Sequence, residues 1–146
     1  MTMTVLDPIA GEDQGVWMRI ERMPAMRCPD GHKRFVAPEF ALRMMQAFVA
    51  GEPLTTLEAA AEKGLLRTRL HCPGCGAELA APAAERIEAR RAIALKGLEA
   101  FDVQVAIPRY RCAGCGKESL PPAKAVNDRL MKASIQAFRA AEIAPT

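Results

Sequence analysis

The stretches LHCPGCG (residues 70–76) and YRCAGCG (residues 110–116) each contain a cysteine turn of the form C-x-x-C-G. Two residues between the cysteines let one tight turn direct both sulfurs at the same ion, and the following glycine accepts a left-handed backbone. Two such turns supply four thiolates, which is the ligand number of a tetrahedral zinc site. The sequence therefore predicts one zinc ion per chain, bound by Cys72, Cys75, Cys112 and Cys115.

Four thiolates fill the coordination shell of zinc and leave no open position for water, so the predicted role of the metal is structural. Iron in a rubredoxin-like site uses the same turns and the same four-sulfur geometry, and it is the alternative metal. Zinc is favoured because such iron centres usually sit among aromatic side chains, whereas this chain has one Trp, one Tyr and five Phe. Unmetallated buried cysteines are a further interpretation, which two independent C-x-x-C-G turns disfavour.

A third, altered copy of the unit, MRCPDGHKRFVAPEF, begins at Met26. In all three copies a proline stands ten residues after the leading cysteine, at Pro38, Pro82 and Pro122. Proline suits the first turn of a helix, and a stretch with helical periodicity follows each of these prolines. The repeat predicts three units, each made of a cysteine turn, a short strand and a helix.

In the first copy Gly31 stands where the second cysteine is expected, and His32 follows it. Cys28 and His32 either form a further ligand pair or belong to a decayed copy with a buried cysteine and an exposed histidine. A second complete site would need a carboxylate such as Asp30. If the first copy joined the second instead, the cysteines of the third copy would be left without partners.

The predicted fold class is α+β, with zinc-ribbon-like β-hairpins from the three repeated units packed against three to four α-helices. Alternating apolar residues predict strands over 16–20 and 101–107. Apolar residues at helical spacing predict helices over 38–50, 82–100 and 122–143. A fourth, shorter helix over 55–66 is predicted from Thr55 and Glu58, which have the spacing of a capping box.

The chain is expected to form one domain over residues 1–146. The repeat units span about 16–50, 65–100 and 101–143, with mobile termini at 1–13 and 144–146. No apolar run approaches the roughly 18 residues that span a bilayer, and the first residues lack the features of a signal peptide. The chain has five cysteines, an odd number, and four of them form two C-x-x-C pairs. This arrangement fits metal binding better than disulfides. These features predict a cytoplasmic protein with no membrane association.

Basic residues gather beside the cysteine turns and are candidates for binding nucleic acid: Arg67, Arg69, Arg109, Arg111 and Lys117. An electrostatic explanation competes with that role, because zinc with four thiolates carries a formal charge of about −2 that nearby cations offset. The net charge of the chain, +3, is too small for the broad basic surface of a dedicated nucleic-acid binder.

The cysteine turns themselves, CPGCG and RYRCAGCGK, resemble the zinc ribbons of insertion-sequence transposases and their regulators. The 36 residues between Cys75 and Cys112 exceed the spacing of a compact ribbon. Separately, residues 28–76 resemble the CpXC-type bacterial domain, in which a cysteine turn leads through helices to a second CPxCG. Gly31 departs from that pattern, and the resemblance implies no particular activity.

Three functions follow as hypotheses. The leading one is a non-enzymatic zinc module that binds a protein partner as an adaptor or small subunit of a bacterial assembly, because no catalytic constellation stands out by spacing. The exposed sides of the helices 38–50 and 122–143 are the expected docking faces. The second is a nucleic-acid-binding regulator, and the third is a rubredoxin-like iron or redox protein. The oligomeric state does not follow from the sequence.

Overall fold

The computed structural model describes residues 1–51, 55, 57–64, 68–80 and 85–144. Its main sheet has four antiparallel strands in the order β2-β3-β9-β8, formed by Ile9–Asp13, Val16–Glu21, Phe101–Pro108 and Arg86–Ile93. In β3 every second residue is buried, and β9 starts with the same alternation. The predicted strands at 16–20 and 101–107 are therefore present, and each directs one apolar row to the same face of the sheet.

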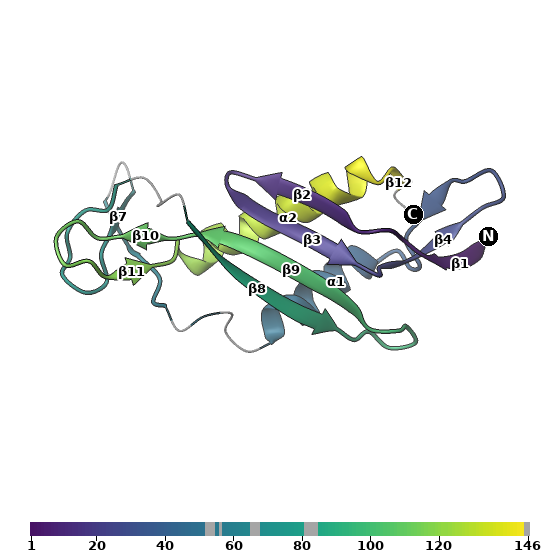
Figure 1. The fold of residues 1–146 in the computed structure, drawn as a ribbon, viewed down its shortest axis with the longest axis horizontal. Coiled ribbons are helices and arrows are strands. Elements are labelled where there is room, and N and C mark those ends of the chain that lie inside the picture. Colours follow the sequence, from purple (N-terminus) through teal and green to yellow (C-terminus); the bar gives the residue numbers. More distant parts are fainter. Residues whose placement is uncertain (52–54, 56, 65–67, 81–84, 145–146) are drawn as a thin grey trace.

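Two helices cover that apolar face, α1 (Phe40–Ala50) and α2 (Ala123–Ala140), as Figure 1 shows. They lie within the helices predicted at 38–50 and 122–143. The buried core is formed by sheet residues such as Met18, Ile20 and Val103 together with helix residues such as Phe40 and Leu130. The result is a two-layer α+β arrangement in which a single hydrophobic cluster joins the sheet to both helices.

Strand β2 and helix α2 approach each other closely at Gly11. A Cβ atom at this position would lie too close to the backbone atoms Ala133 O and Ala137 N. Because backbone atoms cannot move aside as the end of a side chain can, glycine is required here for the helix to pack on the strand.

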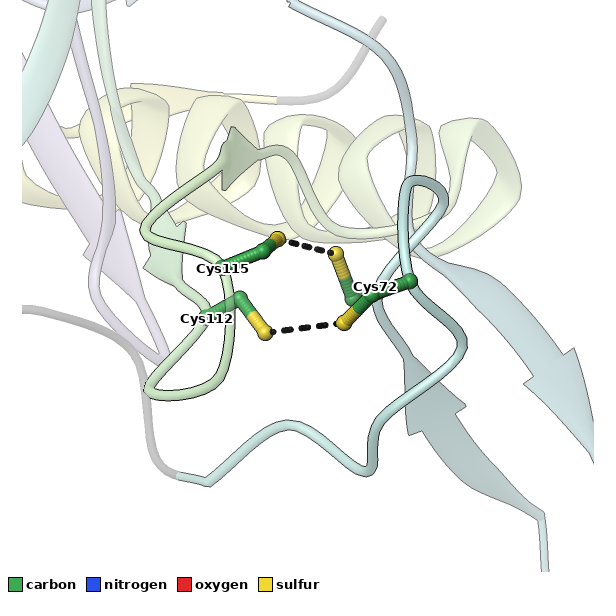
Figure 2. A group of neighbouring side chains, drawn as sticks. Cys72, Cys112 and Cys115 are labelled. Atoms are coloured by element: carbon green, nitrogen blue, oxygen red, sulfur yellow. Dashed lines mark hydrogen bonds between the residues drawn. The ribbon is translucent and has the colours of Figure 1, made fainter.

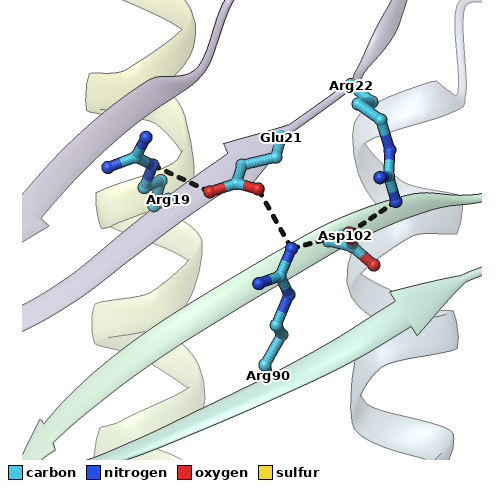
Figure 3. A network of polar contacts seen from close by, with 5 residues as sticks. All are labelled: Arg19, Glu21, Arg22, Arg90 and Asp102. Carbon is cyan, nitrogen blue, oxygen red and sulfur yellow. Dashed lines mark hydrogen bonds and ion pairs between the residues drawn. The ribbon is translucent and has the colours of Figure 1, made fainter.

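The opposite face of the sheet is polar and carries a network of ion pairs (Figure 3). Arg90 reaches both Glu21, at 3.0 Å, and Asp102, at 2.9 Å. Arg22 also binds Asp102, and Arg19 lies 3.2 Å from Glu21. Charges of both signs offset one another across three strands, as expected for a solvated sheet face where each exposed pair contributes little, about 0–1 kcal/mol.

A second sheet lies at one end of the molecule, near the N-terminus (Figure 1). Its strands are β1 (Thr2–Val5), β4 (Pro24–Arg27), β5 (Lys33–Arg34) and β12 (Ile143–Ala144), in that order. The sequence predicts mobile termini at 1–13 and 144–146, of which residues 145 and 146 lie outside the described part. In the described residues, β1 pairs with β4 and β12 pairs with β5. Leu6 and Ile9 are buried in the hydrophobic core.

The cysteine turns lie at the opposite end, which we call the knuckle end (residues 57–80 and 109–121). Two short hairpins carry them, one built around β7 (Arg69–His71) and one from β10 (Tyr110–Arg111) and β11 (Glu118–Ser119). Strand β6 (Ala61–Lys63) pairs with β7, and a parallel bridge joins Ala59 to Leu120. Backbone hydrogen bonds thus connect the two hairpins, through the segment that precedes β6.

The prediction of three to four helices is wrong, because the described residues contain only two. The helix predicted over 82–100 is replaced by strand β8, with residues 82–84 lying outside the described part. Ile87, Ala89 and Ile93 face the core, but Arg91 interrupts this apolar row and hides its period of two. Arg91 is accommodated because its guanidinium donates a hydrogen bond to the backbone carbonyl of Phe48. The guanidinium also lies over the aromatic ring of Phe48, 5.2 Å from the ring centroid.

The helix predicted over 55–66 is also wrong for the described residues, while positions 56, 65 and 66 lie outside them. The hydroxyl of Thr55 does accept a hydrogen bond from the amide of Leu57, at 3.3 Å. A local turn of this kind does not require a helix to follow. Pairing of β6 with β7 instead takes up the backbone groups of Ala61–Lys63.

In the part of the chain that the structure describes, neither helix has the length and apolar character needed to cross a bilayer.

Candidate metal centre

The two cysteine turns of the knuckle end face each other, and their four sulfurs form one cluster (Figure 2). Cys72 Sγ lies 3.6 Å from Cys115 Sγ, and Cys75 Sγ lies 3.5 Å from Cys112 Sγ. All four sulfurs are within 4.8 Å of one another. The structure therefore brings together the four residues that the sequence predicts as ligands, from segments about 40 residues apart in the chain.

These distances suit a bound metal ion. Zinc–sulfur bonds of about 2.3 Å in a tetrahedron place neighbouring sulfurs ~3.8 Å apart, close to the two separations observed. A disulfide would need a separation of about 2.05 Å, which neither pair approaches. The donor set and its spacing therefore fit a four-coordinate thiolate site for a metal ion, as in a zinc ribbon.

Both turns have the same backbone hydrogen bonds, which explains why they present their sulfurs alike. The amide of Cys72 donates to Ala77 O at 2.8 Å, and Gly76 donates back to Cys72 O at 3.0 Å. Cys112 makes the matching bonds with Lys117 and Gly116, at 2.9 and 2.8 Å. The second glycine of each turn has a positive φ, +80° and +75°, a conformation that other residues adopt at a cost.

Backbone amides and neighbouring sulfurs set the acidity of the cluster. The Cys75 amide lowers the pKa of the Cys72 thiol to about 6, and the Cys115 amide lowers the pKa of Cys112. For Cys75 the Ala77 amide acts in the same direction, but the sulfurs of Cys112 and Cys115 outweigh it and raise that pKa to about 11. Cys72 and Cys112 therefore lose their protons readily, whereas Cys75 resists deprotonation. Four thiolates in one cluster need a cation among them.

The centre lies at the surface with its two inner ligands covered. Cys72 and Cys112 are 3% and 2% exposed, whereas Cys75 and Cys115 are exposed. Gly74 and Gly114 stand beside the sulfurs, so that a Cβ on either would be within 4 Å of two of them. At these distances, 3.6–3.9 Å, a Cβ would make ordinary van der Waals contact with the sulfurs.

The basic residues beside the turns are engaged with carboxylates. Arg69 pairs with Glu78 at 3.3 Å and Lys117 with Glu58 at 3.1 Å, a contact that ties the 57–60 segment to the third-copy hairpin. Glu118 accepts from two arginines, Arg109 and Arg111, at 2.9 Å each, and Arg109 also pairs with Glu85. Hydrogen bonding to Arg111 lowers the pKa of Glu118. Arg67 lies outside the described residues.

The carboxylates that pair with these basic residues, Glu58, Glu78 and Glu118, were not predicted from the sequence. The spacing of Arg111 and Glu118 suits opposite positions of a hairpin that closes on a cysteine turn, and the structure pairs these residues. No comparable signal links Lys117 to Glu58, because those residues are far apart in the chain.

Cys28 and His32 lie in the loop between β4 and β5, at the other end of the molecule from the four-cysteine centre (Figure 1). The structure therefore excludes the alternative in which the first copy shares a metal with the second. Cys28, Asp30 and His32 form a separate group whose ligand atoms lie within 4.8 Å of one another.

No protein-family model, curated protein or solved structure matches this chain. The resemblances to zinc ribbons and to the CpXC-type domain therefore remain resemblances of local motifs.

Proposed function

We propose that this chain is a non-enzymatic zinc module that acts as a protein-interaction adaptor or small subunit of a bacterial assembly. The observation that carries the metal part is the meeting of four sulfurs from two facing turns, all within 4.8 Å of one another. In such a site every zinc ligand is supplied by protein, so the metal holds the two hairpins together and has no free position for chemistry.

We propose zinc rather than iron because of the residues that surround the four sulfurs. Tyr110 is the single aromatic residue in the sequence of 57–80 and 109–121. A shell this poor in aromatic groups differs from the usual setting of rubredoxin-like iron. A redox role remains the alternative if iron is found.

A protein partner is proposed over a nucleic acid because the basic residues described beside the cysteine turns are neutralised. Arg69, Arg109, Arg111 and Lys117 each pair with a carboxylate. Phosphate binding depends on unpaired positive charge. Helix α1 meanwhile exposes Leu42 and Val49, which are 51% and 50% exposed and lie two turns apart on one side of the helix. This side of α1 is our candidate for the docking face.

The metal assignment is tested by elemental mass spectrometry of tag-free protein, comparing wild type with Cys115→Ser. We expect the variant to hold one zinc fewer per chain, because three sulfurs bind zinc far more weakly than four. Equal zinc contents would contradict the assignment. Iron in place of zinc would favour the redox alternative.

The partner class is tested by titrating labelled single-stranded and duplex DNA at several salt concentrations. We expect weak binding with little salt dependence, because few phosphates can be neutralised. Glu118→Gln is the matched comparison: it frees both Arg109 and Arg111 of one carboxylate and should strengthen binding and its salt dependence. Tight binding by wild type that weakens steeply with salt would favour the nucleic-acid alternative.

A further inference from the structure

The loop of the first copy has the same backbone hydrogen bonds as the two metal-binding turns, closed one residue earlier. Cys28 N donates to His32 O at 3.0 Å, and Gly31 N donates back to Cys28 O at 2.9 Å. In the other two turns the same pair of bonds joins the cysteine to the residues five and four positions later. The first copy is therefore a cysteine turn that is shorter by one residue.

This shorter turn changes which residue replaces the missing cysteine. Gly31 has a φ of +89°, close to the +80° and +75° of Gly76 and Gly116, so these three glycines are equivalent. Alignment by sequence alone places Gly31 opposite the second cysteine. The structure instead places Asp30 there, because Asp30 precedes the left-handed glycine as Cys75 and Cys115 do.

The three potential ligands of this turn converge. The sulfur of Cys28, a carboxylate oxygen of Asp30 and a ring nitrogen of His32 lie within 4.8 Å of one another. Cys28 Sγ is 3.4 Å from His32 Nδ1. The amide of His32 donates to this sulfur at 3.3 Å, as the amide of Gly74 does to Cys72 at the same distance.

The chemistry of this set selects a particular class of metal. Thiolate and imidazole ligands suit zinc and similar transition-metal ions, and disfavour magnesium and calcium, which prefer all-oxygen sites. One thiolate and one carboxylate balance the charge of a divalent ion, so no net charge remains to be offset. Lys33 and Arg34 beside the turn therefore face a metal-loaded site of no net charge and do not repel it. Glu142 adds a carboxylate nearby, because it lines the same surface hollow as Cys28 and His32.

Three protein ligands leave one tetrahedral position of the metal open. Cys28 and His32 line an exposed hollow of about 560 Å³, which leaves room for water or a small anion at that position. Zinc sites with three protein ligands and a solvent ligand differ in this respect from closed structural sites. The two ends of the molecule thus carry different ligand sets, one closed and one open.

We propose that Cys28, Asp30 and His32 form a second zinc site with an open coordination position. The site is independent of the four-cysteine centre, because the two lie at opposite ends of the molecule (Figure 1).

The first test measures zinc per chain after dialysis of the full-length, tag-free protein against a zinc buffer. We expect two zinc ions in wild type and one in each of Cys28→Ser, Asp30→Asn and His32→Ala. Glu142→Gln, which removes an acid from the same hollow and leaves the three ligands, should keep two. A wild type that holds no more zinc than the Cys28, Asp30 and His32 variants would overturn the proposal. Cys115→Ser loses the other ion, so failure of either site is recognised separately.

The second test addresses the open position in protein loaded with two cobalt(II) ions in place of zinc. Azide should change the visible absorption of wild type by binding to the open cobalt. It should have no effect on Cys28→Ser, whose remaining cobalt lies in the closed centre. Circular dichroism confirms that this variant is folded, which the exposure of the loop leads us to expect. An azide response in both proteins, or in neither, would overturn the open position.

Discussion

Removing zinc from the four-cysteine centre is expected to unfold the knuckle end while the helix-covered sheet stays folded. The buried residues of the main hydrophobic cluster all lie outside 57–80 and 109–121 among those described, and from these two segments only the partly buried Leu120 packs against it, so the core draws little on the turns. The two cysteine turns, in contrast, are held in place by short hairpins and a few backbone hydrogen bonds. Zinc binding to small zinc domains contributes about 10–16 kcal/mol, far more than such contacts supply.

Hydrogen exchange measured by mass spectrometry, with and without a strong chelator, checks this expectation. Amides of the knuckle end should exchange at close to the unfolded rate after chelation, whereas peptides from β3 and the centre of β9 should stay protected. Cys72→Ser should reproduce the pattern without chelator, and Cys28→Ser should not. Uniform loss of protection along the chain would show that zinc supports the whole fold. Unchanged protection everywhere would show that the turns fold without metal.

Phe101→Ala is expected to destabilise the core by about 3–5 kcal/mol, the usual cost of truncating a fully buried aromatic residue. Phe101 has no exposed surface, and its ring stacks on Phe40 with centroids 5.6 Å apart. Phe40 in turn stacks on Phe35, with ring centroids 5.9 Å apart. The substitution therefore leaves a cavity where strand β9 meets helix α1.

Urea denaturation followed by circular dichroism measures this loss. Gln104→Ala is the matched control, because Gln104 is on the same strand but faces away from the core, and its effect should stay within about 0.5 kcal/mol. Zinc content of Phe101→Ala should equal that of wild type, since the four cysteines lie outside the hydrophobic cluster. Similar losses for both variants would contradict the assigned faces of β9.

The spacing of cysteines and the alternation of apolar residues were sufficient to predict several elements. The C-x-x-C-G turns predict which four sulfurs meet, because two residues between cysteines and a left-handed glycine impose one local geometry. Val16, Met18 and Ile20 predict β3, since their period of two has no competing helical interpretation. These signals act within a few residues, where local backbone preferences decide the conformation.

Strand β8 could not be predicted in this way because its conformation depends on a distant partner. Arg91 breaks the apolar alternation, and Ile87, Ala94 and Leu98 imitate a helical stripe. Pairing with all of β9, from Arg86 opposite Pro108 to Ile93 opposite Phe101, overrides that local pattern. Similarly, only the structure shows that Asp30 takes the place of a cysteine. The length of the turn is defined by its backbone hydrogen bonds, which the sequence does not show.

The sequence by itself determined which four cysteines of the second and third copies meet, and the two helices that follow Pro38 and Pro122. These features depend on turn geometry and periodicity within short segments. Tertiary structure alone decided that the first copy lies at the far end of the molecule and that Arg86–Ile93 of the second copy form a strand. It also decided that carboxylates neutralise the basic residues described beside the turns. Each of these outcomes is a contact between residues distant in the chain, and its free energy exists only once the chain has folded.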